Sequence, residues 1–407
     1  MLVPTPGNAQ GEAQRIGDGE RHVMVSRVMN ENRQLLVTLP ESYSRTAIGY
    51  PVLFVLDGSS HILHATATTR FLASARNRVP EMIVVAVPNT NRNRDLTPGP
   101  GAERFQRFFA EELIPWVDSM YRTVPHRIIM GYSLGGSFVT HALLNRPELF
   151  DVYVSVSAPL WRYDSLARDI RVGLTRAARP PKTIHLTVGG NETRQLRAGV
   201  IAFAEQLRLR DSSTGPRWTF ADLADEDHSS TSMRSLYAAL DAHYAAYRFP
   251  FFFEELAELD SVGGVAGMQA HYRRAGQRFG LPPVPPEARV LAAARILVGA
   301  QRHADARALA HSYRQDYPAA AEQIINSAGW DLLRRNDIAR AVELFRENTA
   351  LFPDSPNVHD SLADGLCRAN DRPAALAAVR QAVAAAERRA HPRLARYRQR
   401  LETPCPS

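Results

Sequence analysis

The sequence predicts an α/β fold, with a mostly parallel central sheet and helices on both faces, followed by a small all-α helical-repeat domain. Three observations predict it. Short apolar runs alternate with segments of helical spacing as far as residue 250. One sharp, glycine-flanked turn presents a serine between an apolar run and a helix. Beyond residue 287 the pattern is helical and repeats, since Asn336-Asp337 recurs as Asn370-Asp371, 34 residues later.

The elements of the first domain are expected in a regular order. The first two strands alternate apolar and polar residues, as antiparallel strands do, whereas the later strands are continuously apolar, as central parallel strands are. Ligands bind at the carboxyl ends of such parallel strands. Strands are expected at 21–28, 34–39, 51–56, 83–87, 128–130, 152–156, 183–188 and 217–223, and helices at 104–120, 136–144, from 193 to about 210, and 230–247.

The strongest chemical signal is the turn after the strand at 128–130. Gly131-Tyr132-Ser133-Leu134-Gly135 fits the pattern G-x-S-x-G of a nucleophile elbow. Glycines are needed two residues before and after the serine, because the strand and helix backbones approach too closely for a Cβ atom. The elbow would hold the hydroxyl of Ser133 at the positive end of a helix, where an oxyanion is stabilised. The alternative is a glycine-rich turn that merely contains a serine.

A serine nucleophile needs a histidine to take its proton, and that histidine needs a carboxylate partner. His228 follows the last predicted strand, where the base belongs in the chain order serine, acid, histidine. Glu192 follows the preceding strand and is predicted as the acid, although it could instead be a first-turn helix charge. Asp225 and Asp227 remain alternatives, because they are close in sequence to His228.

The oxyanion hole needs two backbone donors. The amide of Leu134 is predicted as one, and the loop after the strand at 51–56, most simply Ser59, as the other. His61 and the nearby His64 contact substrate or lie on a helix surface. Two further substrate contacts are proposed from strand ends: Trp161, unless it is core, and Arg94, unless it only pairs with Asp95.

Composition excludes several other chemistries. The net charge is +7, and Lys182 is the only lysine, so almost all of the basic residues are arginine. Neither nucleic-acid binding nor a catalytic lysine is therefore expected. Cys367 and Cys405 predict neither a disulfide framework nor a cysteine zinc site. The 13 histidines form no metal-binding spacing, and no apolar run is long enough to span a membrane. No metal and no cofactor are predicted.

The chain resembles the esterase branch of the α/β-hydrolases, which includes enterochelin-type siderophore esterases, S-formylglutathione hydrolase (esterase D) and mycolyltransferases. The resemblance covers roughly residues 20–250. It rests on the stretches 50–58, 84–98, 112–116, 121–123, 131–136, 148–151 and 157–161. It implies a serine esterase that acts on siderophore-like or small acyl esters, or an acyltransferase. It also implies Ser133 as nucleophile, His228 as base, Glu192 as acid, and Ser59 and Leu134 as oxyanion donors. The chain departs from the pattern at 225–229, where relatives often carry glycine.

The expected organisation has five parts: an N-terminus at 1–19, the hydrolase at 20–250, a linker at 251–286, tetratricopeptide-like repeats at 287–401 and a tail at 402–407. About three helix pairs are expected in the repeats, roughly the minimum for a stacked core. They bind a protein partner, self-associate or form a fixed cap. A partner-binding protein with a passive hydrolase platform is the non-enzyme alternative. Gly7-Asn8-Ala9 resembles a signal cleavage site, which favours an exported bacterial protein.

Overall fold

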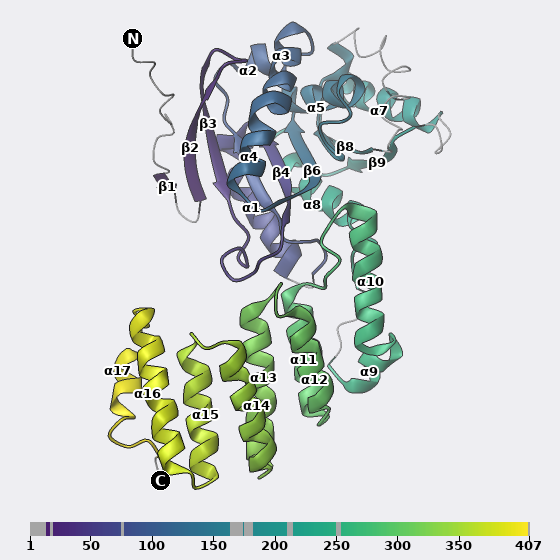
Figure 1. Ribbon diagram of the computed structural model, residues 1–407. Coiled ribbons are helices and arrows are strands. Elements are labelled where there is room, and N and C mark those ends of the chain that lie inside the picture. The colour runs from purple at the N-terminus through teal and green to yellow at the C-terminus, as the bar shows by residue number, and fades with distance from the viewer. Residues whose placement is uncertain are drawn as a thin grey trace, which may run out of the picture. The chain divides into compact units, whose positions relative to one another are not determined.

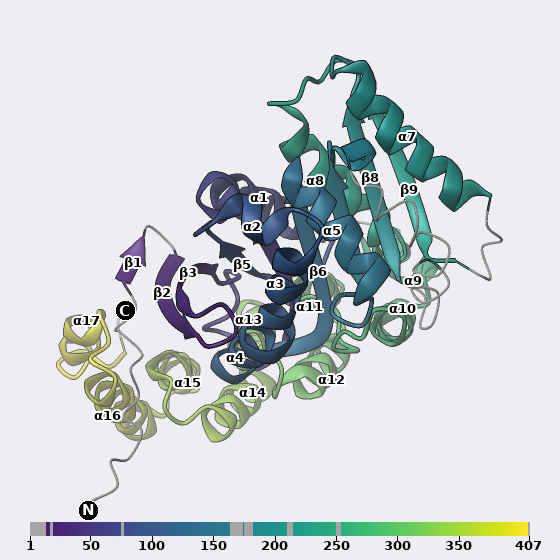
Figure 2. The same ribbon diagram turned by 90° about the horizontal axis from the view of Figure 1, so that it is seen from above.

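The computed structural model describes residues 14–16, 19–74, 77–162, 174, 182–209, 215–249 and 254–405 (Figures 1 and 2). Its contacts divide the chain into two compact units. The first comprises 1–43, 48–250 and 273–283, and the second comprises 44–47, 251–272 and 284–407. The predicted cleavage site Gly7-Asn8-Ala9 lies outside the described residues.

The described part of the first unit contains a nine-stranded sheet in the order β1-β2-β3-β5-β4-β6-β7-β8-β9. Strands β5, β4, β6, β7, β8 and β9 are parallel, and β1, β2 and β3 add an antiparallel edge next to β5. The predicted α/β class is therefore confirmed. The strands are β1 (Gln14–Ile16), β2 (Gly19–Ser26), β3 (Glu31–Thr38), β4 (Tyr50–Leu56), β5 (Ile83–Val87), β6 (Thr123–Tyr132), β7 (Val152–Val156), β8 (Thr183–Gly189) and β9 (Arg217–Leu223).

Helices cover both faces of this sheet (Figure 1). Helix α1 packs against α8, while α2 packs against α3 and α5. Helices α1, α5 and α8 follow the parallel strands β4, β6 and β9 in the chain, so their first turns lie at the carboxyl edge of the sheet. The helices are α1 (Gly58–Ser74), α2 (Arg92–Leu96), α3 (Pro100–Phe108), α4 (Ile114–Met120), α5 (Leu134–Asn145), α7 (Arg194–Arg208) and α8 (Thr231–His243), with a π-helical turn η1 (Phe109–Leu113) and a 3-10 turn η2 (Leu160–Arg162).

Two helical predictions differ from the structure. The single helix expected over 104–120 is divided into α3, η1 and α4. Pro115 lies in the first turn of α4 and has no amide to donate, so the preceding turn widens into the π-helical form. Helix α1 is absent from the prediction, because its buried face includes polar residues such as His61, Thr68 and Thr69, which break the apolar period.

The regular structure of the second unit is helical within its described residues. The interval 251–286, expected as a linker, contains two helices among its described residues. Residues 287–388, all of which are described, form three helix pairs that lie side by side in chain order (Figure 1). The described helices after residue 254 are α9 (Leu256–Ser261), α10 (Gly264–Phe279), α11 (Glu287–Gly299), α12 (His303–Tyr313), α13 (Pro318–Arg334), α14 (Ile338–Leu351), α15 (Pro356–Arg368), α16 (Arg372–Arg388) and α17 (Leu394–Gln399). The residues of α10 from 273 on are assigned to the first unit. No described helix is long and apolar enough to cross a membrane.

The repeated Asn-Asp pair has a structural cause. Asn336 and Asn370 have φ angles of 64° and 60°, in the left-handed region that asparagine tolerates at the end of a helix. The following residues, Asp337 and Asp371, accept hydrogen bonds from the amides of Arg340 and Ala374 and so cap α14 and α16. The period found in the sequence is therefore the period of the turns between paired helices.

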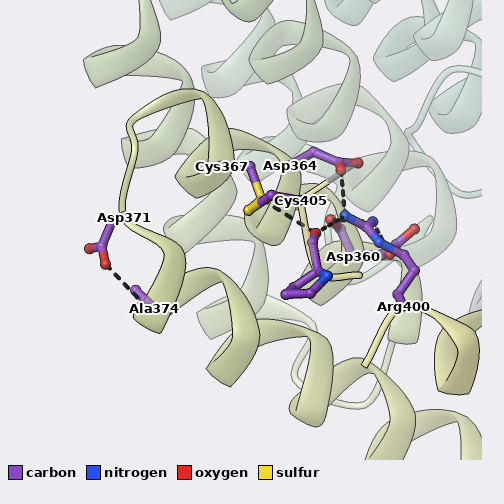
Figure 3. Close-up of a disulfide and its surroundings, with 8 residues drawn as sticks. Asp360, Asp364, Cys367, Asp371, Ala374, Arg400 and Cys405 are labelled. Carbon is purple, nitrogen blue, oxygen red and sulfur yellow. Dashed lines mark hydrogen bonds and ion pairs between the residues drawn. A yellow bond between two sulfur atoms is a disulfide. The ribbon is translucent and has the colours of Figure 1, made fainter. Parts of the chain in front are cut away.

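A disulfide joins Cys367 of α15 to Cys405 near the C-terminus, across 38 residues of sequence (Figure 3). The expectation that these cysteines form no disulfide is wrong. Arg400 explains the difference, because its guanidinium bonds with Asp360 and Asp364 of α15 and with the carbonyl of Pro404. These bonds fold the chain after α17 back against α15, which brings Cys405 to its partner.

Reducing this disulfide should destabilise the helical repeats by about 4 kcal/mol, because the cross-link removes conformational entropy from the unfolded chain. Urea unfolding of the full chain, followed by circular dichroism with and without dithiothreitol, measures the effect. Cys405→Ser should unfold at the lower midpoint under both conditions. Equal midpoints for the oxidised native chain and Cys405→Ser would show that the cross-link adds no stability.

Candidate active site

Ser133 occupies a strained turn between β6 and α5. Its φ and ψ angles are 56° and −120°, a conformation that residues with a Cβ atom rarely adopt. The amide of Ser133 donates to the carbonyl of Val156 on the neighbouring strand β7, at 2.8 Å. The strand, the turn and the helix thus have the geometry that the sequence predicts for an elbow around Ser133.

The glycines of the elbow are required by close backbone contacts. A Cβ atom at Gly131 would lie 2.2 Å from the carbonyl oxygen of Gly135. A Cβ atom at Gly136 would lie 2.9 Å from the carbonyl oxygen of Val156 and 2.9 Å from the Cβ atom of Ala158. All three distances are too short for a Cβ atom, so glycine at both positions allows α5 to start directly against the sheet.

Ser133, His228 and Glu192 form a continuous chain of hydrogen bonds. The Oγ atom of Ser133 is 3.1 Å from Nε2 of His228, and Nδ1 of the same ring is 2.7 Å from Oε2 of Glu192. A carboxylate can only accept, so the hydrogen is on Nδ1 and the lone pair of Nε2 faces the serine hydroxyl. This tautomer is the one that a general base beside a serine requires.

Glu192 is buried and held by three donors. Its side chain is 1% exposed. Besides the His228 ring, Oε1 accepts from the hydroxyl of Ser157 and from the amide of Gly189 at 3.2 Å. Burial alone would raise the pKa of Glu192, but the hydrogen bonds from His228, Ser157 and Gly189 outweigh it and hold the pKa below the ordinary value of 4.5. Glu192 is therefore an anion at neutral pH.

Backbone hydrogen bonds bring the two loops together after β8 and β9. The amide of Gly190 donates to the carbonyl of Leu223, and the amide of Asn191 donates to the carbonyl of Glu226. Asp227, an alternative acid in the sequence, instead accepts from the amides of Ser229 and Ser230 at 2.8 and 3.1 Å. Asp227 therefore stabilises the turn that carries His228, as an Asx turn does. Asp225 is exposed.

The turn after β4 lies beside the elbow. Asp57 has a φ angle of 51°, and its carboxylate accepts from Asn89 at 2.5 Å and from Nε of Arg92 at 2.6 Å. A Cβ atom at Gly135 would lie 3.3 Å from this carboxylate, so the turn contacts the start of α5. Ser59 is in the first turn of α1 and Leu134 in the first turn of α5, where backbone amides have no partner within the helix. Both predicted oxyanion donors thus lie at the ends of the adjacent strands β4 and β6.

His61 lies in the same region. Its ring contacts the ring of Tyr132 at a centroid distance of 5.5 Å, and its Nδ1 atom is 2.9 Å from Nε2 of His64. Burial lowers the pKa of both histidines, and for His64 burial and then His61 lower the pKa to about 4. The pair is therefore uncharged at neutral pH and adds a polar, neutral surface beside the elbow.

The other two predicted substrate residues differ in their surroundings. Trp161, in η2 after β7, is 48% exposed and lies on α7 at Gly199, where a Cβ atom would be 3.1 Å from that of Trp161. Arg94 does not fit the substrate role expected of it. Its guanidinium is shared between Glu31 at 2.7 Å and Asp95 at 2.6 Å, in a cluster at the antiparallel edge of the sheet. Arg92 is the arginine that lies beside the elbow, since it also approaches the carbonyl of Tyr132 at 3.5 Å.

Sequence reasoning missed two side chains that contact His228 and Glu192. Ser157, which contacts Glu192, directly follows β7 and has a φ angle of 48°. Tyr132, within the G-x-S-x-G motif, contacts His228. Their positions at strand ends are the only sequence signal for either role. Within the described residues, no group of three or more histidine, cysteine, aspartate or glutamate side chains is placed to hold a metal ion.

Comparison with known proteins shows the family to which this chain is similar. The model of the family described as "Putative esterase" matches residues 26–233. The ferri-bacillibactin esterase BesA of Bacillus subtilis is 28% identical over 245 residues, which cover 52% of this chain and 84% of that protein. The siderophore enterobactin esterase of Emericella nidulans is 31% identical over 159 residues, covering 31% of this chain and 51% of that protein.

A solved structure shares the fold. The IroE-like serine hydrolase of Shewanella oneidensis superposes with a TM-score of 0.58 and 23% sequence identity, covering 75% of this chain and 99% of that chain. Because the family model spans about half of the sequence, including Ser133, Glu192 and His228, the chain belongs to the esterase family of α/β-hydrolases and is an enzyme that hydrolyses carboxylic esters.

Proposed function

We propose that this enzyme cleaves an ester bond of a siderophore through an acyl-enzyme on Ser133. The observation that carries the proposal is the pair of hydrogen bonds that joins Ser133 to His228 at 3.1 Å and His228 to Glu192 at 2.7 Å. His228 is the general base, and Glu192 fixes its tautomer and stabilises its positive charge during the reaction.

The reaction then has two stages. In the first, the Oγ atom of Ser133 attacks the ester carbonyl while His228 takes the proton from this hydroxyl. His228 then gives the same proton to the departing alcohol. In the second, His228 takes a proton from water, the water oxygen attacks the acyl carbonyl, and His228 returns the proton to Oγ of Ser133 as the bond between Oγ and the acyl group breaks. The amides of Leu134 and Ser59 stabilise the oxyanion in both stages, because each belongs to a helix N-terminus.

The substrate class rests on the relatives. Two of them are siderophore esterases by name, and the match to BesA spans most of that protein. His61 and Trp161 are proposed as substrate contacts, because a neutral imidazole beside the elbow and a half-exposed indole after β7 suit a polar aromatic ligand. Arg94 is left out of this set, since it is shared between two carboxylates.

The test is hydrolysis of ferri-bacillibactin and enterobactin by the full-length chain, with p-nitrophenyl acetate as a simple ester. Mass spectrometry follows the products, and Ser133→Ala is the matched control. We expect a kcat/KM for one siderophore that exceeds the simple ester by about tenfold or more, because remote binding energy contributes to the rate. Cleavage of the simple ester alone would contradict the siderophore assignment. Transfer of the acyl group to added glycerol, in preference to water, would contradict hydrolysis as the main reaction.

A further inference from the structure

His228 lies in a segment that burial alone does not hold in place. Its side chain is 43% exposed, and residues 224–230 form turns between β9 and α8. Catalysis requires both ring nitrogens to keep their partners at the same time, and small displacements of a catalytic group can lower rates strongly. The turn therefore needs contacts that fix it relative to Ser133. Asp227 orders the turn internally, but its bonds to Ser229 and Ser230 do not connect the turn to the elbow.

Tyr132 makes that connection. Its hydroxyl donates a hydrogen bond to the backbone carbonyl of His228, and its ring contacts the imidazole at a centroid distance of 5.0 Å. The tyrosine ring also contacts the ring of His61, at a centroid distance of 5.5 Å. Since Tyr132 directly precedes Ser133, its side chain spans from the nucleophile to the turn that carries the base, which is 96 residues away in sequence.

The phenol is a durable donor. Burial, followed by the nearby charge of Glu192, raises the pKa of Tyr132 to about 12, so the hydroxyl keeps its proton at every pH at which an esterase works. The backbone of Tyr132 is also fixed, because it is the last residue of β6 and pairs with Val156 of β7. The donor therefore belongs to the rigid sheet, and the acceptor belongs to the less restrained turn.

We infer that Tyr132 is a positioning residue, whose hydroxyl ties the His228 turn to the nucleophile elbow and keeps the imidazole aligned with both Ser133 and Glu192. The inference rests on the proposed catalytic roles of Ser133, His228 and Glu192. It assigns a specific task to the variable second position of the G-x-S-x-G motif in this chain. It also predicts that removing the hydroxyl oxygen of Tyr132 lowers kcat without weakening substrate binding.

The test compares Tyr132→Phe with Tyr153→Phe in the full-length chain. Tyr153 is a matched control, because its hydroxyl also donates to a backbone carbonyl, that of Arg146 at 3.3 Å, but it lies in the core of the same unit. We expect Tyr132→Phe to lower kcat about fivefold and to leave KM within about twofold, since a hydrogen bond of this kind contributes about 1 kcal/mol. Tyr153→Phe should change kcat by less than about twofold.

A spectroscopic readout separates alignment from general stability. The proton between Nδ1 of His228 and Glu192 should give a low-field NMR resonance, assigned by its absence from His228→Ala. In Tyr132→Phe this resonance should broaden through faster exchange with water, whereas in Tyr153→Phe it should stay sharp even if the melting temperature falls. An unchanged kcat and an unchanged resonance in Tyr132→Phe would overturn the inference, as would a loss confined to KM.

Asp227→Ala gives a second route if Tyr132→Phe does not fold. It removes the exposed carboxylate that orders the same turn, so it should also lower kcat and broaden the resonance while KM is retained. A normal kcat in Asp227→Ala would show that order in the turn does not limit the reaction and would also overturn the inference. The proposed function has a separate control, because its failure would appear as ester hydrolysis that survives in Ser133→Ala and His228→Ala.

Discussion

Replacing Ser133 by alanine should lower kcat/KM for ester hydrolysis by about 10⁴-fold or more, and His228→Ala should cause a loss of similar size. In serine hydrolases the nucleophile and base act as a unit, so removing either one loses most of what the pair contributes. The structure supports this expectation, because Nε2 of His228 is the acceptor that faces Oγ of Ser133 at 3.1 Å.

The measurement is steady-state hydrolysis of the best ester, with circular dichroism to confirm that each variant folds. The double variant Ser133→Ala, His228→Ala should be no slower than either single variant, because the two losses are not additive. A double variant that loses the product of the two single effects would indicate that the residues act independently. Retention of more than about 1% of the native rate in Ser133→Ala would contradict the proposed nucleophile.

The second large effect concerns the acid. Glu192→Gln should lower kcat by about 10³- to 10⁴-fold, because an amide that donates to Nδ1 would favour the wrong tautomer of His228. Asp227→Asn is the control, since its side-chain oxygen still accepts from Ser229 and Ser230, and it should cost less than about threefold. A greater loss from Asp227→Asn than from Glu192→Gln would move the acid to Asp227.

The lowered pKa of Glu192 gives the same variant a pH signature in stability. A carboxylate whose folded-state pKa is below the ordinary 4.5 stabilises the fold above that pH, and the contribution is lost as the pH falls through the folded-state value. The native enzyme should therefore be more stable than Glu192→Gln near neutral pH, and the difference should shrink below pH 4.5. Urea unfolding from neutral pH to about pH 3 measures it. A stability difference between the native enzyme and Glu192→Gln that grows on acidification would contradict a lowered pKa of Glu192.

The sequence predicted the features that follow from local pattern and from the order of residues along the chain. The strand–turn–helix at Ser133 could be predicted because its glycines and apolar strand are local, and His228 could be proposed as the base because it follows the last strand of the fold. Glu192 could be proposed by position but not separated from Asp227. The separation depends on two backbone bonds, Gly190 to Leu223 and Asn191 to Glu226, that no local pattern records.

The remaining features depend on contacts between distant parts of the chain. Tyr132 and Ser157 reach partners 96 and 35 residues away, and Arg94 finds Glu31 across 63 residues. The disulfide was missed for the same reason, since the position of Cys405 depends on how Arg400 anchors the chain to α15. Polar residues at strand ends indicate a site, but their partners follow only from the three-dimensional packing.

Labelling with a fluorophosphonate tests the central claim most directly. Intact-mass spectrometry of the native full-length chain should show a single adduct, which peptide mapping places on Ser133. The adduct should be absent from Ser133→Ala and formed far more slowly by His228→Ala. A folded native chain that forms no adduct, or an adduct that persists in Ser133→Ala, would contradict the assignment of Ser133 as an activated nucleophile.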